Sequence, residues 1–513
     1  MDIDTWDEQP LLHAQQPSTD EEWRASLGQY LEARNDLPLL RCLAVARESG
    51  ASTLVAETGY IDADYRSEYG SYFAHQFRHR PDTAHRLHFF SERLSLDEIE
   101  RGTSPDSYLG YVVLRPCETG PVSRAMLQPP PSVAGAVRTS VVDKINLCGQ
   151  DLAVSGVPFS QQDAQMGSCA HASAWMCHYT AALRGDAARQ TTGYLAECVD
   201  SKLNTSRPIP TQGLTVLQLS ELFRYLGLPA YAYEVGSLPS PGLPWQRSDP
   251  TPPSGGNPVP PGTWDDRIVP VVCRFLNSGL PVLVGAIGPD RANGHAFVLC
   301  GYKRTTRDGK RWVEFVRHDD QRGPYLRVDD VLADIDPDTG HSYGPWSTIH
   351  IPAPEKLWLG PEHAERAGGL LLHRQATLLG NDQQSVVASQ LHDIVANGRF
   401  SVRSYAMRSN RFKSELPTRG VPSDVAVAYR LMSLPRYVWV VEAIDRARRD
   451  RGEPCVLGET LWDATSSDHR PEVLTSHMAG FMLIASNVRS CSESPIFVSA
   501  DFQPYESGGV GPV

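Results

Sequence analysis

The chain has 513 residues and a formal net charge of −12, which argues against a general nucleic-acid or membrane-surface binder. It contains no apolar run of about 18 residues that could span a membrane, and its acidic, polar start is unlike a signal peptide. The 10 cysteines are scattered without a C-x-x-C pair, so we expect reduced thiols, no metal, no cofactor and a cytoplasmic protein. This length predicts two to four domains.

The first part of the chain carries no motif of known chemistry. Residues 1–25 are polar and acidic, and we expect them to be a disordered tail. Residues 26–128 mix helical and apolar strand-like segments and predict an N-terminal α+β domain of unknown role. The run Pro129-Pro130-Pro131 predicts the boundary after it.

Cys169 lies in the segment QQDAQMGSCAHASAWMCHY, where a turn leads into a helix. Ser168 is a favourable N-cap residue, and the chain from Cys169 to about Arg184 favours a helix. Cys169 is then the first helical residue, where free backbone N–H groups and the helix dipole favour a thiolate. A thiolate is the nucleophilic form of cysteine, so Cys169 is a candidate catalytic nucleophile.

A proline-rich stretch at 238–262 follows and predicts an extended insertion. Its simplest role is a solvated connector. Trp245 within it could instead anchor a lid or a docking arm near a cleft, which makes Trp245 a candidate substrate-binding residue.

His295 opens the apolar run AFVLC, which predicts a short buried strand after the glycine-containing loop GPDRANG. A histidine at the start of a core strand can reach a cleft while its backbone stays fixed. We therefore interpret His295 as the catalytic base, and Gly294 as a candidate substrate-binding residue beside it.

The next predicted strand, RWVEFVR, runs into His318-Asp319-Asp320. An aspartate at that strand end could accept the second N–H of His295 and so fix its tautomer and orientation. Either aspartate is compatible with the pattern. We favour Asp319, which comes first at the strand end, and keep Asp320 as the alternate.

Residues 354–513 alternate apolar and polar side chains in several runs and predict a β-rich C-terminal accessory domain. Two helices are expected in it, at Ser385–Val395 and Val441–Asp450.

Taken together, GSCAHASAWM, GLTVLQLSELFRYLGLPAYAY, LNSGLPVLVG, GHAFVLCGY and HDDQRGPY resemble the papain-like cysteine peptidase superfamily, and within it the bacterial branch of double-glycine leader peptidases. The order Cys, His, Asp and the spacing from Cys169 to His295 are similar to those of papain. The resemblance implies a domain at 143–353 with a helix bearing Cys169 and an antiparallel sheet bearing His295 and Asp319. The predicted fold class is α+β, with this papain-like domain flanked by the two accessory domains.

The oxyanion-stabilising residue is where the chain departs from this family. Papain-like enzymes have a glutamine six residues before the cysteine, and that position here is Asp163. Gln161, Gln162 and Gln165 lie nearby, and a turn longer by one residue lets Gln162 take the role. The resemblance then implies acyl transfer through a thioester, with Gln162 and the Cys169 N–H holding the oxyanion.

The expected function is that of a cysteine peptidase or isopeptidase acting on a peptide or protein, without nucleic-acid or membrane partners. Acyl transfer of the transglutaminase or deamidase type uses the same residues and differs only in the second nucleophile. A catalytically inactive binding or scaffold protein with the same fold is the alternative outside the enzymes. The oligomeric state stays open.

Overall fold

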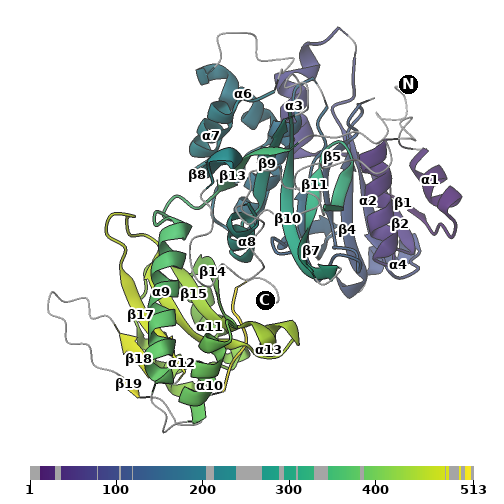
Figure 1. Cartoon of the computed structure of the whole chain (residues 1–513). Helices are drawn as coiled ribbons and strands as arrows, with labels where there is room; N and C mark the ends of the chain where they lie inside the picture. The colour runs from purple at the N-terminus through teal and green to yellow at the C-terminus, as the bar shows by residue number, and fades with distance from the viewer. Residues whose placement is uncertain are drawn as a thin grey trace. The chain divides into compact units, whose positions relative to one another are not determined.

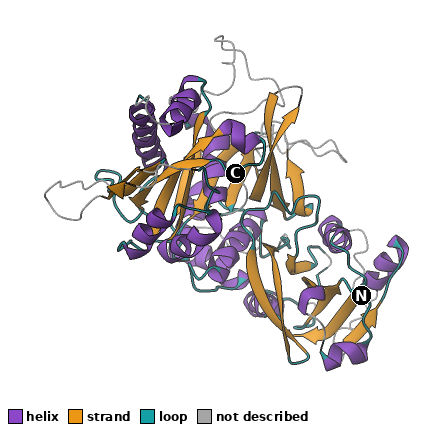
Figure 2. Cartoon of the chain, turned by 90° about the horizontal axis from the view of Figure 1, so that it is seen from below, coloured by secondary structure: helices purple, strands orange, loops and turns teal. Residues whose placement is uncertain are grey.

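The structure is a computed structural model of the whole chain, and it combines helices with antiparallel β-sheets in an α+β fold (Figure 2). It describes residues 12–28, 30, 36–77, 79–102, 105–117, 119–163, 165–203, 213–238, 268–287, 294–307, 310–328, 345–381, 386–479, 481–484, 496–497 and 503–509. Two compact units are present, and each is described by itself. The first comprises Met1–Leu238, Pro260–Asp265 and Leu280–Pro354, and the second comprises Pro239–Val259, Asp266–Gly279 and Glu355–Val513.

The first unit contains two antiparallel sheets (Figure 1). One has the strand order β1-β2-β3-β4-β5-β7-β6, and the other has the order β12-β11-β10-β9-β13-β8. The strands of the first sheet are β1 (Leu12–Gln15), β2 (Thr53–Tyr60), β3 (Ala84–Phe90), β4 (Tyr108–Leu114), β5 (Val122–Leu127), β6 (Val141–Leu147) and β7 (Gln150–Phe159). Those of the second are β8 (Ala230–Glu234), β9 (Val282–Ile287), β10 (Gly294–Arg307), β11 (Lys310–Asp319), β12 (Gly323–Val328) and β13 (Trp346–Pro352).

Helices cover these sheets and close the core of the first unit. They are α1 (Asp20–Gly28), α2 (Leu37–Glu48), α3 (Ala63–Ser71), α4 (Leu96–Arg101), α5 (Cys169–Leu183), α6 (Thr192–Leu203) and α7 (Val216–Tyr225). The helix α5 packs against β10 and β9 of one sheet and against β7 and β6 of the other. It therefore lies at the junction of the two sheets, with its residues from Ala170 to Ala181 buried.

A single apolar core crosses the boundary that the three prolines predict. It joins Leu43 of α2, Val112 of β4, Trp175 of α5 and Val298 of β10, among others. The strand β5 pairs with β7, so the segments before and after Pro129–Pro131 share one sheet. The prediction of a separate domain at 26–128 is therefore wrong, because non-local strand pairing makes this segment part of the same unit.

The predicted disordered tail at 1–25 is also wrong for its described part. The strand β1 pairs with β2 at the edge of the first sheet, and the helix α1 follows from Asp20. Trp23 of α1 is buried and stacks on Phe89 with ring centroids 6.3 Å apart. Residues 1–11 lie outside the described residues. An acidic composition thus did not prevent this segment from burying its few large apolar side chains.

The second unit is built on one antiparallel sheet with the order β14-β15-β16-β17-β18-β19. Its strands are β14 (Phe400–Arg408), β15 (Tyr437–Asp445), β16 (Val456–Asp463), β17 (Val473–Met478), β18 (Phe481–Ile484) and β19 (Ile496–Phe497). Its helices are α8 (Ile268–Asn277), α9 (Pro361–Gly380), α10 (Val386–Ala396), α11 (Ser409–Arg419), α12 (Ser423–Leu431) and α13 (Arg446–Asp450). The helix α9 packs along β14 to β17 (Figure 1).

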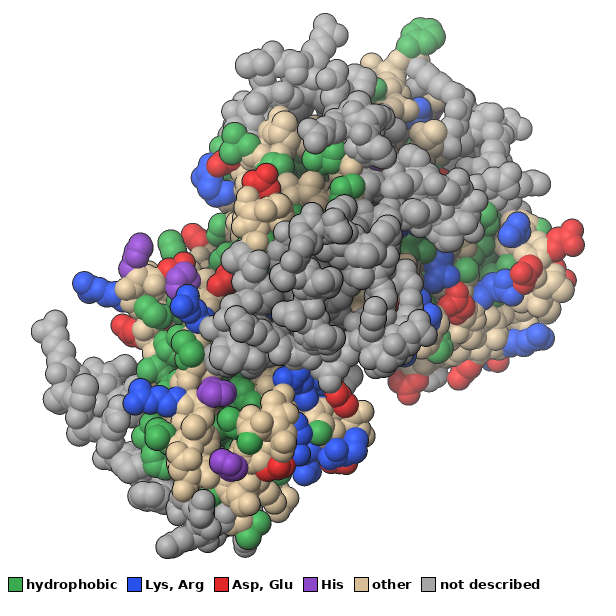
Figure 3. Space-filling model, viewed as in Figure 1, with side chains coloured by type: hydrophobic (Ala, Val, Ile, Leu, Met, Phe, Trp, Pro, Cys, Tyr) green, Lys and Arg blue, Asp and Glu red, His purple; other side chains and the backbone are tan. Residues whose placement is uncertain are grey.

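This unit differs from the predicted β-rich domain in its helices. The helix expected at Ser385–Val395 is α10. The one expected at Val441–Asp450 is half wrong, because its first half belongs to the buried strand β15 and its second half forms the short helix α13. Figure 3 shows basic side chains gathered over α13, in which no residue is buried. The segment holding α8, expected in the papain-like domain, belongs to this unit. None of the described helices is both long enough and apolar enough to cross a bilayer.

Candidate active site

Cys169 is the first residue of α5, as the sequence predicts. Ser168 has extended backbone and forms a capping box with His171, whose Nδ1 lies 2.9 Å from the Ser168 hydroxyl oxygen. The Cys169 thiol is free and half-buried. The cysteine therefore sits where unpaired N–H groups and the helix dipole favour a negative charge.

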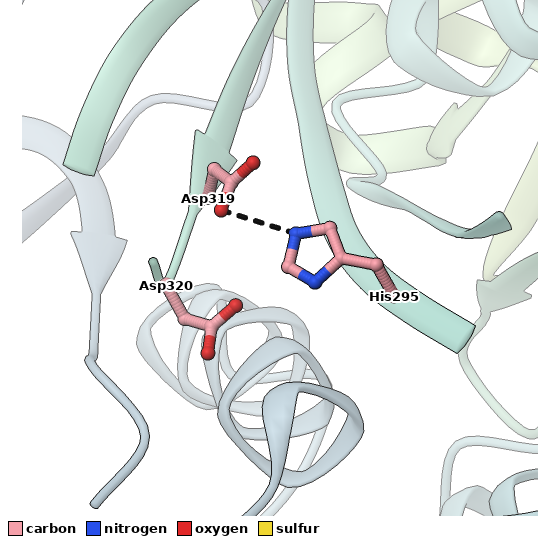
Figure 4. Close-up of side chains that lie close together, drawn as sticks. All are labelled: His295, Asp319 and Asp320. Carbon is pink, nitrogen blue, oxygen red and sulfur yellow. Dashed lines mark hydrogen bonds and ion pairs between the residues drawn. The ribbon is translucent and has the colours of Figure 1, made fainter. Parts of the chain in front are cut away.

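His295 and Asp319 lie side by side on neighbouring strands (Figure 4). His295 is near the start of β10, and Asp319 is the last residue of β11. Because the two strands are antiparallel, the start of one meets the end of the other. The His295 Nε2 lies 3.1 Å from Asp319 Oδ1, and both side chains are buried. The predicted orienting contact is present, and it is made by Asp319.

The charges around His295 favour its protonated form. Burial lowers its pKa, but the Asp319 charge, the hydrogen bond to Asp319 and a hydrogen bond with the Cys169 thiol outweigh this and raise the pKa well above the ordinary value. Burial raises the pKa of Asp319, but His295 and the Arg317 guanidinium, 3.5 Å away, lower it to about 2. The surroundings therefore favour an imidazolium beside a carboxylate in this pair.

Asp320 is the second buried carboxyl of this group. Neither of its oxygens has a hydrogen bond that meets normal geometry among the described residues, although the Gln162 backbone N–H lies close enough to favour its charged form. Burial, with the Asp319 charge beside it, raises the Asp320 pKa to about 7. Asp320 is therefore a neighbour of the His295–Asp319 pair and not its hydrogen-bond partner.

His295, Asp319 and Asp320 also offer ligand atoms that all lie within 4.8 Å of one another, a spacing that suits a metal ion. The sequence-based expectation of no metal did not anticipate this grouping. The Nε2 of His295 is already engaged by Asp319, so a metal bound at that nitrogen would have to displace the contact.

Three glutamines near Cys169 are candidates for the oxyanion position, and two of them are engaged elsewhere. The Gln161 side chain accepts a hydrogen bond from the Val122 N–H at 3.1 Å and donates to Asp36 at 2.8 Å. The Gln165 side chain accepts from Gln76 at 3.3 Å. The Gln162 side chain is half-buried and makes no hydrogen bond to a described residue, so it is the one available to a substrate.

The two predicted substrate-binding residues have different outcomes. Gly294 is the exposed first residue of β10, directly before His295. Trp245 and nearly all of the insertion at 238–262 lie outside the described residues, so the lid hypothesis stays a prediction.

A small pocket with a mainly apolar lining lies against the loop that carries Gln162. Its charged lining comprises Glu68, Arg115 and Asp163, and its apolar lining includes Trp175 and Leu195. No sequence pattern assigned these charged residues a role at the site. Asp163 had a usable signal, an aspartate just before a turn, whereas Glu68 and Arg115 are far from the loop in sequence and gave none.

The comparisons with known proteins add no family to this geometry. No protein-family model matches the sequence, and a search of curated proteins gives no match.

Proposed function

We propose that this chain is a papain-like cysteine hydrolase, a peptidase or isopeptidase acting on a peptide or protein. The observation that carries the proposal is the arrangement of three groups. Cys169 begins a helix with its thiol close enough to His295 to raise the pKa of that ring, and His295 in turn lies 3.1 Å from the buried carboxylate of Asp319. The predicted papain-like domain, with a cysteine-bearing helix packed on an antiparallel sheet, fits the position of α5 against β10.

In this proposal, His295 enters the reaction as an imidazolium and Cys169 as a thiolate. The thiolate attacks the carbonyl carbon of the scissile bond, and the resulting oxyanion is held by the Cys169 N–H and the Gln162 side chain. His295 then gives its proton to the leaving amine, and a thioester forms. Neutral His295 next takes a proton from water, which attacks the thioester and frees Cys169. Asp319 keeps the ring oriented throughout.

The test is alkylation of the wild type and of Cys169→Ser with an iodoacetamide probe between about pH 5 and pH 9. Rapid, Cys169-dependent labelling below about pH 7 supports a thiolate paired with His295. Labelling that rises only near about pH 8.5, as for an ordinary thiol, would contradict the proposal and favour a binding or scaffold role. Repeating the assay with a chelator separates a thiol enzyme from a metal-dependent one, because only the latter is affected.

Peptidase and acyl-transfer chemistry differ in the acceptor of the thioester. Mass spectrometry of a proteome treated with wild type or Cys169→Ala protein tells them apart. New peptide termini indicate a peptidase, whereas glutamines converted to glutamate or carrying amine adducts indicate a deamidase or transferase.

A further inference from the structure

The loop at 161–168, which carries Gln162 and leads to Cys169, is held by Arg115. This residue follows β4 and is only 2% exposed. Its Nη2 donates to the Gln161 carbonyl at 2.6 Å, and its Nε donates to the Gly120 carbonyl at 2.8 Å. Its Nη1 forms two bonds with the Glu68 carboxylate, at 2.9 and 2.7 Å. One planar guanidinium thus fixes the peptide unit directly before Gln162.

Asp163, a residue of the same loop, stabilises it through hydrogen bonds to its backbone. Its Oδ1 accepts three backbone hydrogen bonds, from Gln165 at 3.1 Å, Met166 at 3.0 Å and Gly167 at 2.8 Å. A carboxylate that accepts several N–H bonds forms strong, charge-assisted contacts. These bonds fold the turn that delivers Ser168 and Cys169 to the start of α5.

The main chain of Gln162 is also packed tightly. Gly120 has φ +67°, and a Cβ added there would come 2.0 Å from the Gln162 carbonyl oxygen. The loop is therefore pinned on both sides of Gln162, while the Gln162 side chain itself makes no hydrogen bond to a described residue. This is the arrangement expected of a donor held ready for a charge that forms only during reaction.

We propose that Arg115 and Asp163 are positioning residues that fix the 161–168 loop so that Gln162 and the Cys169 N–H can stabilise an oxyanion. The inference rests on the proposed function and gives a role to the N-terminal segment that supplies Arg115 and Glu68.

An oxyanion forms when a thiolate attacks an ester or amide carbonyl. It does not form when a thiolate displaces iodide from iodoacetamide. The two reactions of the same cysteine therefore separate loop positioning from thiolate reactivity.

The experiment measures Cys169 acylation by p-nitrophenyl acetate and Cys169 alkylation by iodoacetamide in the wild type, Arg115→Lys, Asp163→Asn and Asp163→Ala. We expect acylation to fall at least about tenfold in each variant, since a displacement of about 1 Å can cost a factor of about 100. We expect alkylation and its pH profile to stay within about twofold. Gln162→Ala should reproduce the acylation defect with the loop intact. Arg138→Lys, at a buried arginine of the same unit that donates to the Gly135 and Val137 carbonyls, is the matched control.

If Cys169 of the wild type is reactive, two outcomes would overturn this inference and leave the proposed function standing. One is unchanged acylation in the variants. The other is an equal fall in both reactions, which would mean that these residues support the fold or the Cys169–His295 pair. If Asp163→Ala does not fold, the isosteric Asp163→Asn decides between the outcomes. A wild type whose Cys169 alkylates only like an ordinary thiol would overturn the proposed function itself, and the inference with it.

Discussion

Replacing Asp320 with asparagine should stabilise the first unit at alkaline pH and leave it nearly unchanged in acid. Burial, with the Asp319 charge beside it, raises the Asp320 pKa from its ordinary value of 3.8 to about 7. Between these two values the folded chain binds more protons than the unfolded chain, so the free energy of unfolding decreases as the pH rises. Each pKa unit corresponds to about 1.4 kcal/mol, so the wild type loses up to about 4 kcal/mol over this range.

Asparagine does not ionise, so Asp320→Asn removes that loss. The substitution also replaces the charged acceptor beside the Gln162 N–H, which offsets the gain by about 1 kcal/mol. We therefore expect the variant to be about 3 kcal/mol more stable than the wild type near pH 8, with a difference near zero at about pH 4.

Urea unfolding at several pH values measures this difference, and hydrogen exchange of peptides from β10 and β11 assigns the transition to the first unit. Asp151→Asn, at an exposed aspartate of the same unit, is the control. Equal or lower stability of Asp320→Asn at pH 8 would refute the reasoning. A gain of the same size at both pH values would also refute it, because the gain would then come from packing and not from ionisation.

Three further predictions concern single side chains. Asp319→Asn should slow turnover of a peptide substrate more than Asp320→Asn does, because Asp319 is the one of these two aspartates that hydrogen-bonds to His295. The reverse order in kcat/KM would show that the wrong aspartate was assigned. Tyr325→Phe should lower the free energy of unfolding of the first unit by about 1–3 kcal/mol. The hydroxyl accepts from the buried Val157 N–H at 2.9 Å and donates to the buried Leu127 carbonyl at 2.8 Å. An unchanged urea midpoint would contradict this. Arg419→Met should lower the free energy of unfolding of the second unit by about 3–5 kcal/mol, because it leaves Glu442 and Glu459 without their shared cation. A loss below about 1 kcal/mol would contradict this.

The sequence predicts the parts of the candidate site that depend on neighbouring residues. Ser168 and Cys169 begin a helix because a capping residue precedes a run without proline or glycine. The strand after His295 and the hairpin that leads to Asp319 follow from apolar runs separated by a polar turn. Once the hairpin is formed, the position of Asp319 beside His295 follows from antiparallel pairing. Local patterns were therefore enough to bring the two residues together.

The domain organisation depends on pairings that no local pattern encodes. Pro129–Pro131 mark a break in secondary structure, but β5 and β7 pair across that break. The Tyr325 hydroxyl of β12 then bridges the same two strands, accepting from the Val157 N–H and donating to the Leu127 carbonyl. A run of three prolines interrupts the hydrogen bonding of a strand where it stands, but it does not decide which strands pair on either side.

The same limit explains why the sequence singled out the candidate residues Cys169, His295 and Asp319 but not the residues that hold the 161–168 loop. A nucleophile and a base are recognisable because their chemistry needs particular residue types in particular local settings. A positioning residue needs only to reach a backbone group, and Arg115 reaches the Gln161 carbonyl from the end of a strand far away in sequence. Asp163 folds the loop through its own carboxylate. Under the proposed function, this structural role is compatible with an aspartate at the position where papain-like enzymes have a glutamine, so the aspartate does not by itself argue against activity.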